Sequence, residues 1–205
     1  MILDIEVLKI PKEKEGEYLD AINHLISEMK KVTPSPSHPG ASSTWAFTSN
    51  INSATSKVCD ILYECVRSRL SADVSEVQRK LSRHHQSLTN KHNYGPMSWH
   101  SDNHSEQILN LIVWLTDVDE TCGPMQYITL KGKVVSREFS SPAGGKNLES
   151  QSAKILNTGG VIKNCTGSVG TAFLFDNNIY HRATPPCKKD RDALKLQIRI
   201  SNYKI

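Results

Sequence analysis

The sequence predicts a mainly β protein with helices near its N-terminus, and three observations lead to this prediction. Two stretches within the first 70 residues repeat apolar side chains at helical spacing. From about residue 108 onward, the apolar runs are short, rich in β-forming residues and separated by turn residues. The last of these runs alternates apolar and polar side chains. Early helices followed by many short strands suggest helices packed against a β-sandwich or barrel.

The composition is that of an ordinary globular protein. A length of 205 residues fits one domain with a substantial core, and 38% hydrophobic and 22% charged residues are typical values. The net charge of +4 is small and the basic residues are scattered, so no nucleic-acid partner is indicated. No apolar run approaches the length of a membrane span. We expect a single domain over residues 1–205 without a membrane partner, and the oligomeric state stays open.

The cysteines and the N-terminus bear on the compartment. The five cysteines are odd in number and include no C-x-x-C pair, which argues against both a disulfide framework and a zinc ribbon. The first residues lack the basic lead and apolar core of a signal peptide. Reduced thiols and a cytoplasmic location are therefore expected.

Element by element, the first half is expected to contain a strand and two helices. Pro11 ends the strand because proline has no N–H to donate to a sheet. Lys30 and Lys31 fall at the C-terminal end of the first helix, where the helix dipole favours cations. The expected elements are a strand at 2–10, a helix at 15–31, a Pro- and Ser-rich loop at 33–40 and a helix at 54–70.

The second half is expected to consist mainly of strands. Residues 75–87 fit a helical stripe only weakly because they hold many basic residues. The nearly continuous apolar run at 108–115 predicts a strand buried on both faces, and the alternation at 194–201 predicts a half-exposed strand. The remaining expectations are a loop at 90–96, a turn at 117–124, a strand at 125–130, an irregular excursion at 138–160, a turn at 166–170 and a strand leading to residue 181.

Three side chains are candidate metal ligands. His100 and Asp102 lie two positions apart, so a strand would project both from one face. His181 follows a distant apolar run. Two histidines and one carboxylate that leave open positions form the facial triad of non-haem Fe(II) oxygenases. Arg191, ten residues beyond His181, is a permanent cation suited to gripping a carboxylate in a bidentate pair.

The surrounding motifs resemble the Fe(II)- and 2-oxoglutarate-dependent dioxygenases, specifically the phytanoyl-CoA dioxygenase-like family. The resemblance covers roughly residues 77–203 in its order of elements. Two departures are Thr129-Leu130-Lys131-Gly132, where the family has Pro-Gly-Ser-His, and Thr171, where it has Asp. The first 75 residues match no part of it. The motifs are Trp99-His100-Ser101-Asp102, the strand Val113-Trp114-Leu115 with the turn Thr121-Cys122-Gly123-Pro124-Met125, and the stretch from Gly170 to His181.

The resemblance implies a double-stranded β-helix, the cupin-like jelly-roll, over about residues 76–205, with a helical part over about 1–75. It also implies an enzyme that uses dioxygen to oxidise a small organic molecule while 2-oxoglutarate is decarboxylated to succinate. Hydroxylation is favoured because related halogenases lack the carboxylate that Asp102 supplies. The implied contacts are Fe(II) at His100, Asp102 and His181, and 2-oxoglutarate at Arg191, with Thr184 and Asn110 as further contacts.

Other readings stay open. One is a non-catalytic cupin-like module that binds a metal or senses a ligand, and another is a hydrolase or isomerase that uses a different divalent metal. Arg199 is the rival of Arg191, Asp176 is a rival carboxylate expected to lie in a turn, and His104 is a candidate neighbour of the triad. Substrate contacts are expected from the loops at 33–43, 87–97 and 131–160.

Overall fold

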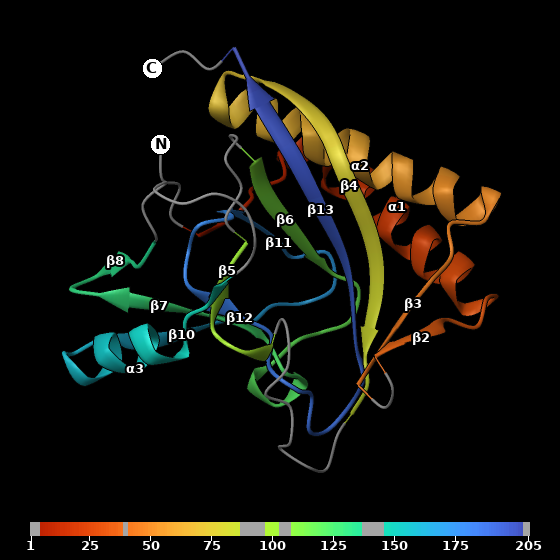
Figure 1. Ribbon diagram of the computed structural model, residues 1–205. Helices are drawn as coiled ribbons and strands as arrows, with labels where there is room; N and C mark the ends of the chain where they lie inside the picture. The colour runs from red at the N-terminus through yellow and green to blue at the C-terminus, as the bar shows by residue number, and fades with distance from the viewer. Residues whose placement is uncertain (1–4, 39–40, 87–96, 103–107, 137–145, 203–205) are drawn as a thin grey trace.

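Two antiparallel sheets and three α-helices make up the fold (Figure 1). The computed structural model describes residues 5–38, 41–86, 97–102, 108–136 and 146–202. The larger sheet has the strand order β1-β11-β6-β13-β4-β3-β2. Its strands are β1 (Glu6–Val7), β2 (Ser35–His38), β3 (Ser42–Thr44), β4 (Asp73–His84), β6 (Ile108–Trp114), β11 (Ala172–Asp176) and β13 (Arg191–Ser201).

The smaller sheet has the strand order β10-β7-β12-β5-β9, and β8 pairs with β7 outside this path. Its strands are β5 (His100–Ser101), β7 (Met125–Leu130), β8 (Lys133–Val134), β9 (Lys146–Asn147), β10 (Val161–Cys165) and β12 (His181–Arg182). Two facing antiparallel sheets of this kind form a jelly-roll, as the sequence predicts.

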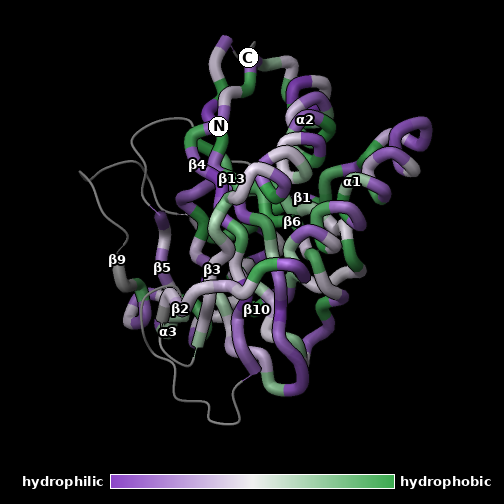
Figure 2. The backbone as a smooth tube through the Cα atoms, turned by 90° about the vertical axis from the view of Figure 1, so that its right-hand side faces the viewer, coloured by the Kyte–Doolittle hydropathy of each residue, from purple (hydrophilic) through white to green (hydrophobic). Residues whose placement is uncertain are grey.

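Helices α1 (Lys12–Lys30) and α2 (Ser49–Leu70) cover one face of the larger sheet (Figure 1). Both helices repeat apolar residues at helical spacing, and these side chains are buried against each other and against the sheet. Hydrophobic segments accordingly gather between the helices and the sheet in Figure 2. The Thr48 hydroxyl begins α2 by accepting a hydrogen bond from the N–H of Ile51. Helix α3 (Glu149–Asn157) lies beside the smaller sheet (Figure 1).

The long strand β13 separates the helical core from the interior between the sheets. Leu194, Leu196 and Ile198 are fully buried and belong to the cluster that contains the helices. The alternate positions face the opposite way, because successive side chains of a strand point to opposite sides of the sheet. Strand β4 runs antiparallel beside β13, with Leu81 opposite Leu194. Each of these two strands therefore gives one face to the core and the other to the interior.

Two of the expected elements are wrong, and the segment that was left undecided at 75–87 contains a strand. Strand β2 occupies part of 33–40, where a loop was expected, and pairs with β3. Residues 75–84 belong to strand β4 rather than to a helix. Their polar side chains lie on both faces of the sheet, where Arg79 bonds to Ser56 of α2 and Lys80 lines the interior between the sheets. Within 138–160 the described residues include α3, whose few apolar side chains give only a weak helical signal.

The other elements agree in type with the sequence, and both N-terminal helices begin earlier than expected. Of the strand expected at 2–10, residues 2–4 lie outside the described part, and β1 covers Glu6–Val7. The loop at 90–96 also lies outside it. No helix in the described part of the chain is both long enough and apolar enough to cross a membrane.

Candidate metal centre

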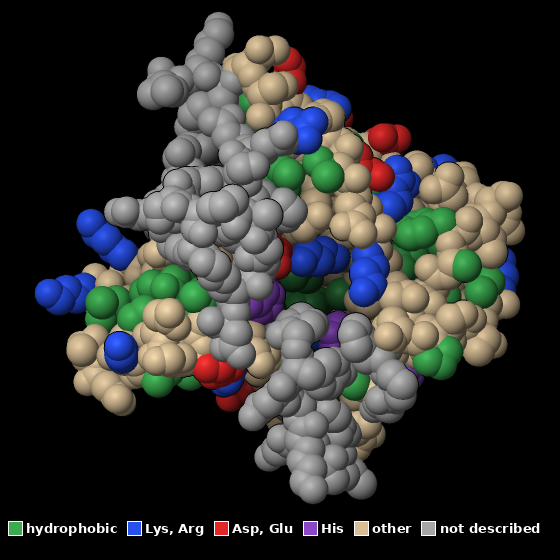
Figure 3. Space-filling view, viewed as in Figure 1, with side chains coloured by type: hydrophobic (Ala, Val, Ile, Leu, Met, Phe, Trp, Pro, Cys, Tyr) green, Lys and Arg blue, Asp and Glu red, His purple; other side chains and the backbone are tan. Residues whose placement is uncertain are grey.

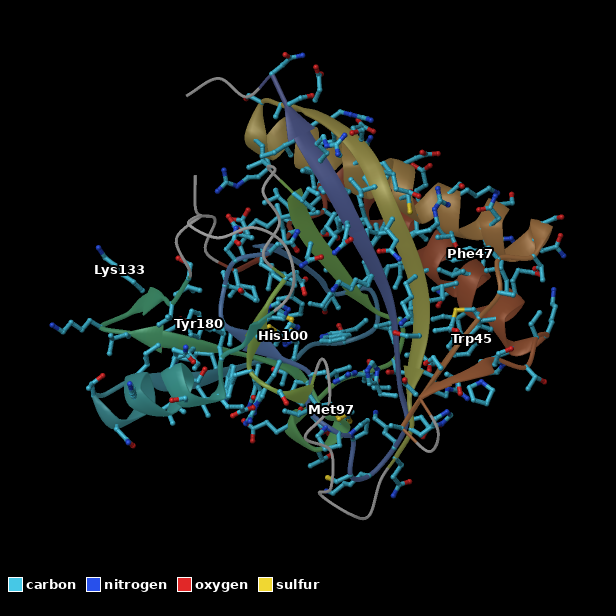
Figure 4. All side chains as sticks on the ribbon, viewed as in Figure 1. Trp45, Phe47, Met97, His100, Lys133 and Tyr180 are labelled. Atoms are coloured by element: carbon cyan, nitrogen blue, oxygen red, sulfur yellow. The ribbon has the colours of Figure 1, made fainter. Side chains whose placement is uncertain are left out.

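Two strands of the smaller sheet bring the candidate histidines together. Strand β12 pairs antiparallel with β5, and His181 is the register partner of His100. Their ring centroids lie 4.3 Å apart. His181 is buried and His100 is half-buried. Figure 4 shows His100 between the two sheets. The pairing of β5 with β12 thus brings together two imidazoles that are 81 positions apart in the sequence.

Both imidazoles are held by the backbone in the orientation that metal binding requires. The Nδ1 of His100 lies 2.8 Å from the carbonyl oxygen of Ser98, and the Nδ1 of His181 lies 3.0 Å from that of Ile179. A carbonyl oxygen only accepts hydrogen bonds, so each Nδ1 carries the proton and donates it. Each Nε2 then keeps its lone pair for a metal ion.

Asp102 completes the cluster from the residue after β5. Its N–H donates to the carbonyl oxygen of Asn177, which fixes the backbone there. The Asn110 side chain donates from Nδ2 to Asp102 Oδ2 at 2.9 Å and also contacts the Asn177 side chain. One ligand atom from each of His100, Asp102 and His181 lies within 4.8 Å of the others. This spacing suits one small cation.

The electrostatics of the cluster favour the metal-binding protonation states. Burial lowers the pKa of His181 to about 4, so its imidazole is neutral at physiological pH. Burial alone would raise the pKa of Asp102. The Lys195 ammonium, the two histidines and the Asn110 amide outweigh that effect and hold it well below its usual range. The cluster therefore offers a carboxylate and at least one neutral imidazole.

The cluster opens into a pocket of about 400 Å³ between the sheets. This volume lies in the range of small-molecule sites. In the space-filling view, basic and histidine side chains surround a hollow on this face of the molecule (Figure 3). The lining combines polar side chains of β4 and β13 with apolar ones, namely Ser42, Gln78, Lys80, Ser82, His84, His100, Ile112, Trp114, Met125, His181, Ala183, Arg191, Ala193, Lys195 and Gln197.

Arg191 lines this pocket as a buried cation. Its side chain is only 3% exposed, and its guanidinium carbon lies 5.4 Å from the Trp114 ring centroid. Among the described residues it has no carboxylate partner, its Nε has no hydrogen-bond partner, and Nη1 reaches only the Thr184 carbonyl oxygen at 3.5 Å. Burial lowers its pKa to about 10, so it stays charged at neutral pH. A buried guanidinium in this state is suited to an anion from outside the chain.

A glycine turn supports the segment that contacts Arg191. Gly123 has a φ of 66°, and a Cβ there would overlap the backbone of the segment from Thr184 to Pro186. Only glycine permits both the left-handed conformation and this close approach. The Thr184 hydroxyl donates to the carbonyl oxygen of Pro124 at 2.6 Å, which ties the same two segments together.

The structure thus brings four of the six predicted site residues to one pocket or its metal-ligand cluster: His100, Asp102, His181 and Arg191. The Asn110 amide donates to the Asp102 carboxylate, and the Thr184 hydroxyl donates to the carbonyl oxygen of Pro124 rather than pointing into the pocket. Contacts of these two residues with 2-oxoglutarate therefore stay predictions.

The rival residues lie elsewhere. Arg199 is exposed near the far end of β13. Asp176 bonds the backbone N–H and side chain of Asn178 in a turn, as expected. His104 lies outside the described residues.

Sequence reasoning missed Lys80 and Lys195, which also line the pocket. The alternation along β13 indicated only that Lys195 lies on its polar face, and nothing in the sequence of β4 singled out Lys80. The two lysines are brought together by the register of the two strands.

No family model matches the chain, and no curated protein matches it in sequence. Solved structures do match in fold. The epimerase SnoN, in complex with Fe³⁺, alpha-ketoglutarate (2-oxoglutarate) and nogalamycin RO, has a TM-score of 0.66 at 10% identity, covering 97% of this chain and 80% of SnoN.

Two further structures give the same result. AviO1 from Streptomyces viridochromogenes Tue57 has a TM-score of 0.64 at 12% identity, covering 100% of this chain and 93% of AviO1. EctD from S. alaskensis, with 2-oxoglutarate and 5-hydroxyectoine, has a TM-score of 0.60 at 19% identity, covering 98% and 73%. None of these descriptions points to the phytanoyl-CoA dioxygenase-like family, so that narrower assignment stays a prediction. The chain has the jelly-roll fold of solved enzymes that bind iron and 2-oxoglutarate.

Proposed function

We propose that this chain is a non-haem Fe(II)- and 2-oxoglutarate-dependent oxygenase that oxidises a small organic molecule. His100, Asp102 and His181 would hold the iron, and Arg191 would hold the distal carboxylate of 2-oxoglutarate. Bound iron, 2-oxoglutarate and dioxygen supply an oxidant while 2-oxoglutarate is converted to succinate and carbon dioxide. Hydroxylation remains the favoured outcome.

The observation that carries the proposal is the buried Arg191 without an acidic partner in the described chain, in the same pocket as the His-Asp-His cluster. A metal-binding or ligand-sensing cupin needs the cluster but has no need of a buried guanidinium beside it. A buried cation costs stability unless an anion joins it, so its presence favours a carboxylate co-substrate. SnoN and EctD, which share the fold, are described with 2-oxoglutarate bound.

The chain's own residues have separate tasks in this proposal. The two histidines present Nε2 because their Nδ1 protons are engaged by the backbone. Asn110 orients the Asp102 carboxylate through its side-chain amide. Trp114 packs under the Arg191 guanidinium and keeps water from it, which strengthens its attraction for a carboxylate.

Succinate release tests the proposal. Iron-loaded protein is incubated with 2-oxoglutarate under air and under nitrogen, alone and with a library of small molecules. We expect slow, dioxygen-dependent succinate release that a substrate accelerates and that His181→Ala abolishes. Folded, iron-loaded protein that releases none with any compound, or release that persists in His181→Ala, would contradict the proposal.

A further inference from the structure

Two lysines stand side by side on the pocket wall. Lys80 on β4 is the register partner of Lys195 on β13, and both line the pocket. Directly opposite residues on neighbouring antiparallel strands have Cβ atoms about 5 Å apart, and like charges there repel. In agreement, burial and then the Lys195 charge lower the pKa of Lys80. Lys80 is exposed and Lys195 is half-buried, so solvent weakens this repulsion, and an anion bound between the two ammonium groups would offset what is left.

The described residues supply little compensation. Lys80 has neither an ion pair nor a hydrogen bond to any described residue. The acidic partner of Lys195 is Asp102, with Nζ 3.4 Å from Oδ2. A metal ion held by Asp102 would take over that negative charge. The next pocket-facing pair along the two strands, Gln78 and Gln197, is uncharged. Two ammonium groups would then face the pocket without an acidic neighbour among the described residues.

The lysine pair and Arg191 mark different ends of the pocket. Lys195 lies four positions along β13 from Arg191, which corresponds to roughly 13 Å along an extended strand. The intervening pair, Ser82 and Ala193, carries no charge. If Arg191 holds the distal carboxylate of 2-oxoglutarate, the lysine end remains available to a second molecule. Apolar side chains of the same pocket, Ile112, Trp114 and Met125, provide a surface for an uncharged body.

The net charge of the loaded pocket also favours an anionic second molecule. A divalent metal, Arg191, Lys80 and Lys195 together exceed Asp102 and a 2-oxoglutarate dianion by about two positive charges, counting the three basic side chains as charged. A neutral substrate would leave that excess in a partly enclosed site, whereas a carboxylate or a phosphate monoester would neutralise part or all of it.

We propose that the substrate has an anionic group, a carboxylate or a phosphate, which Lys80 and Lys195 bind at the end of the pocket away from Arg191. This inference rests on the proposed function, since it names the class of molecule that the oxygenase would oxidise. The lysine pair holds the anion, and the apolar side chains hold the body of the substrate near the metal.

Calorimetric titration of the anaerobic protein, loaded with Fe(II) and 2-oxoglutarate, tests the inference. The probes are phenyl phosphate, phenylacetate and the uncharged benzyl alcohol. The wild type is expected to bind one of the anions at least tenfold more tightly than the alcohol. Lys80→Met, which keeps an apolar stem and removes the charge, should weaken that anion at least fivefold, while Lys80→Arg should stay within threefold. Lys163→Met, an exposed lysine of β10, is the matched control and should change nothing.

Each outcome decides the question. Preference for phenyl phosphate assigns a phosphate ester, and binding of phenylacetate alone assigns a carboxylate. The inference is overturned if neither anion binds better than the alcohol, or if Lys80→Met binds the anion as tightly as the wild type. The visible band of the Fe(II)–2-oxoglutarate chelate is recorded in each sample. A band without anion preference refutes only this inference, whereas absence of the band refutes the proposed function.

Discussion

Replacing Arg191 by methionine should have opposite effects on the stability of the metal-free protein and on its affinity for 2-oxoglutarate. Burial lowers the pKa of Arg191 from its ordinary value of 12.5 to about 10. At 1.36 kcal/mol for each pH unit between the two values, keeping the cation buried costs roughly 3 kcal/mol. Methionine removes this cost and retains packing against Trp114, so the metal-free variant should unfold at the same temperature as the wild type or at a higher one.

The same change should remove 2-oxoglutarate binding. Loss of one partner of a buried, hydrogen-bonded charge pair costs about 2–5 kcal/mol. That range corresponds to a fall in affinity of about 30- to 4,000-fold. Anaerobic calorimetry on Fe(II)-loaded protein measures the affinity, and calorimetric melting of the metal-free protein measures stability.

Arg83→Met is the matched control. Arg83 is paired with Asp192 outside the pocket, so its loss should lower the melting temperature and leave 2-oxoglutarate affinity unchanged. An Arg191→Met protein that binds 2-oxoglutarate within threefold of the wild type would refute the role given to Arg191.

Three further predictions concern the metal cluster and its support. Asn110→Ala should weaken Fe(II) about 10- to 100-fold, because Asp102 loses the amide that orients it; unchanged affinity in a metal titration would count against that role. The free energy of unfolding of the metal-free protein should fall as the pH drops from 6.5 toward 4, because the unfolded state protonates His181 before the folded state does. Denaturant titrations should show a shallower fall with pH in His181→Asn than in the wild type. An equal fall in the two proteins would contradict the role given to His181. Gly123→Ala should cost about 2 kcal/mol or more in denaturant unfolding and weaken 2-oxoglutarate binding, whereas Gly132→Ala, also at positive φ but in open space, should cost about 1 kcal/mol; equal costs would contradict the close approach at Gly123.

The metal ligands were predictable because they belong to short sequence motifs made of metal-binding residue types. His100 and Asp102 lie two residues apart, and His181 and Arg191 follow in a fixed order. Residue type and order were enough to group them, and the pairing of β5 with β12 brings the histidines together. The orientation of each ring was not predictable, because it depends on backbone carbonyl groups rather than on side chains.

The pocket wall formed by β4 and β13 could not be predicted from the sequence, and the reason is physical. Strand β4 carries polar residues on both faces, such as Arg79 toward α2 and Lys80 toward the pocket, so its sequence lacks the apolar alternation of a half-buried strand. The meeting of Lys80 with Lys195 depends on strand register across 115 residues, which composition does not specify. Helix α3 was missed because among the described residues its fully buried side chain is a serine, Ser152.

The central claim is that His100, Asp102 and His181 hold iron beside a 2-oxoglutarate site. Anaerobic addition of Fe(II) and 2-oxoglutarate to the metal-free protein tests it most directly, through the visible charge-transfer band of the chelate. The account predicts a band that saturates at one iron per chain in the wild type, is lost in His181→Ala and needs more Fe(II) to appear in Asp102→Ala. A folded wild-type protein that gives no band, or a band that survives unchanged in both variants, would contradict it.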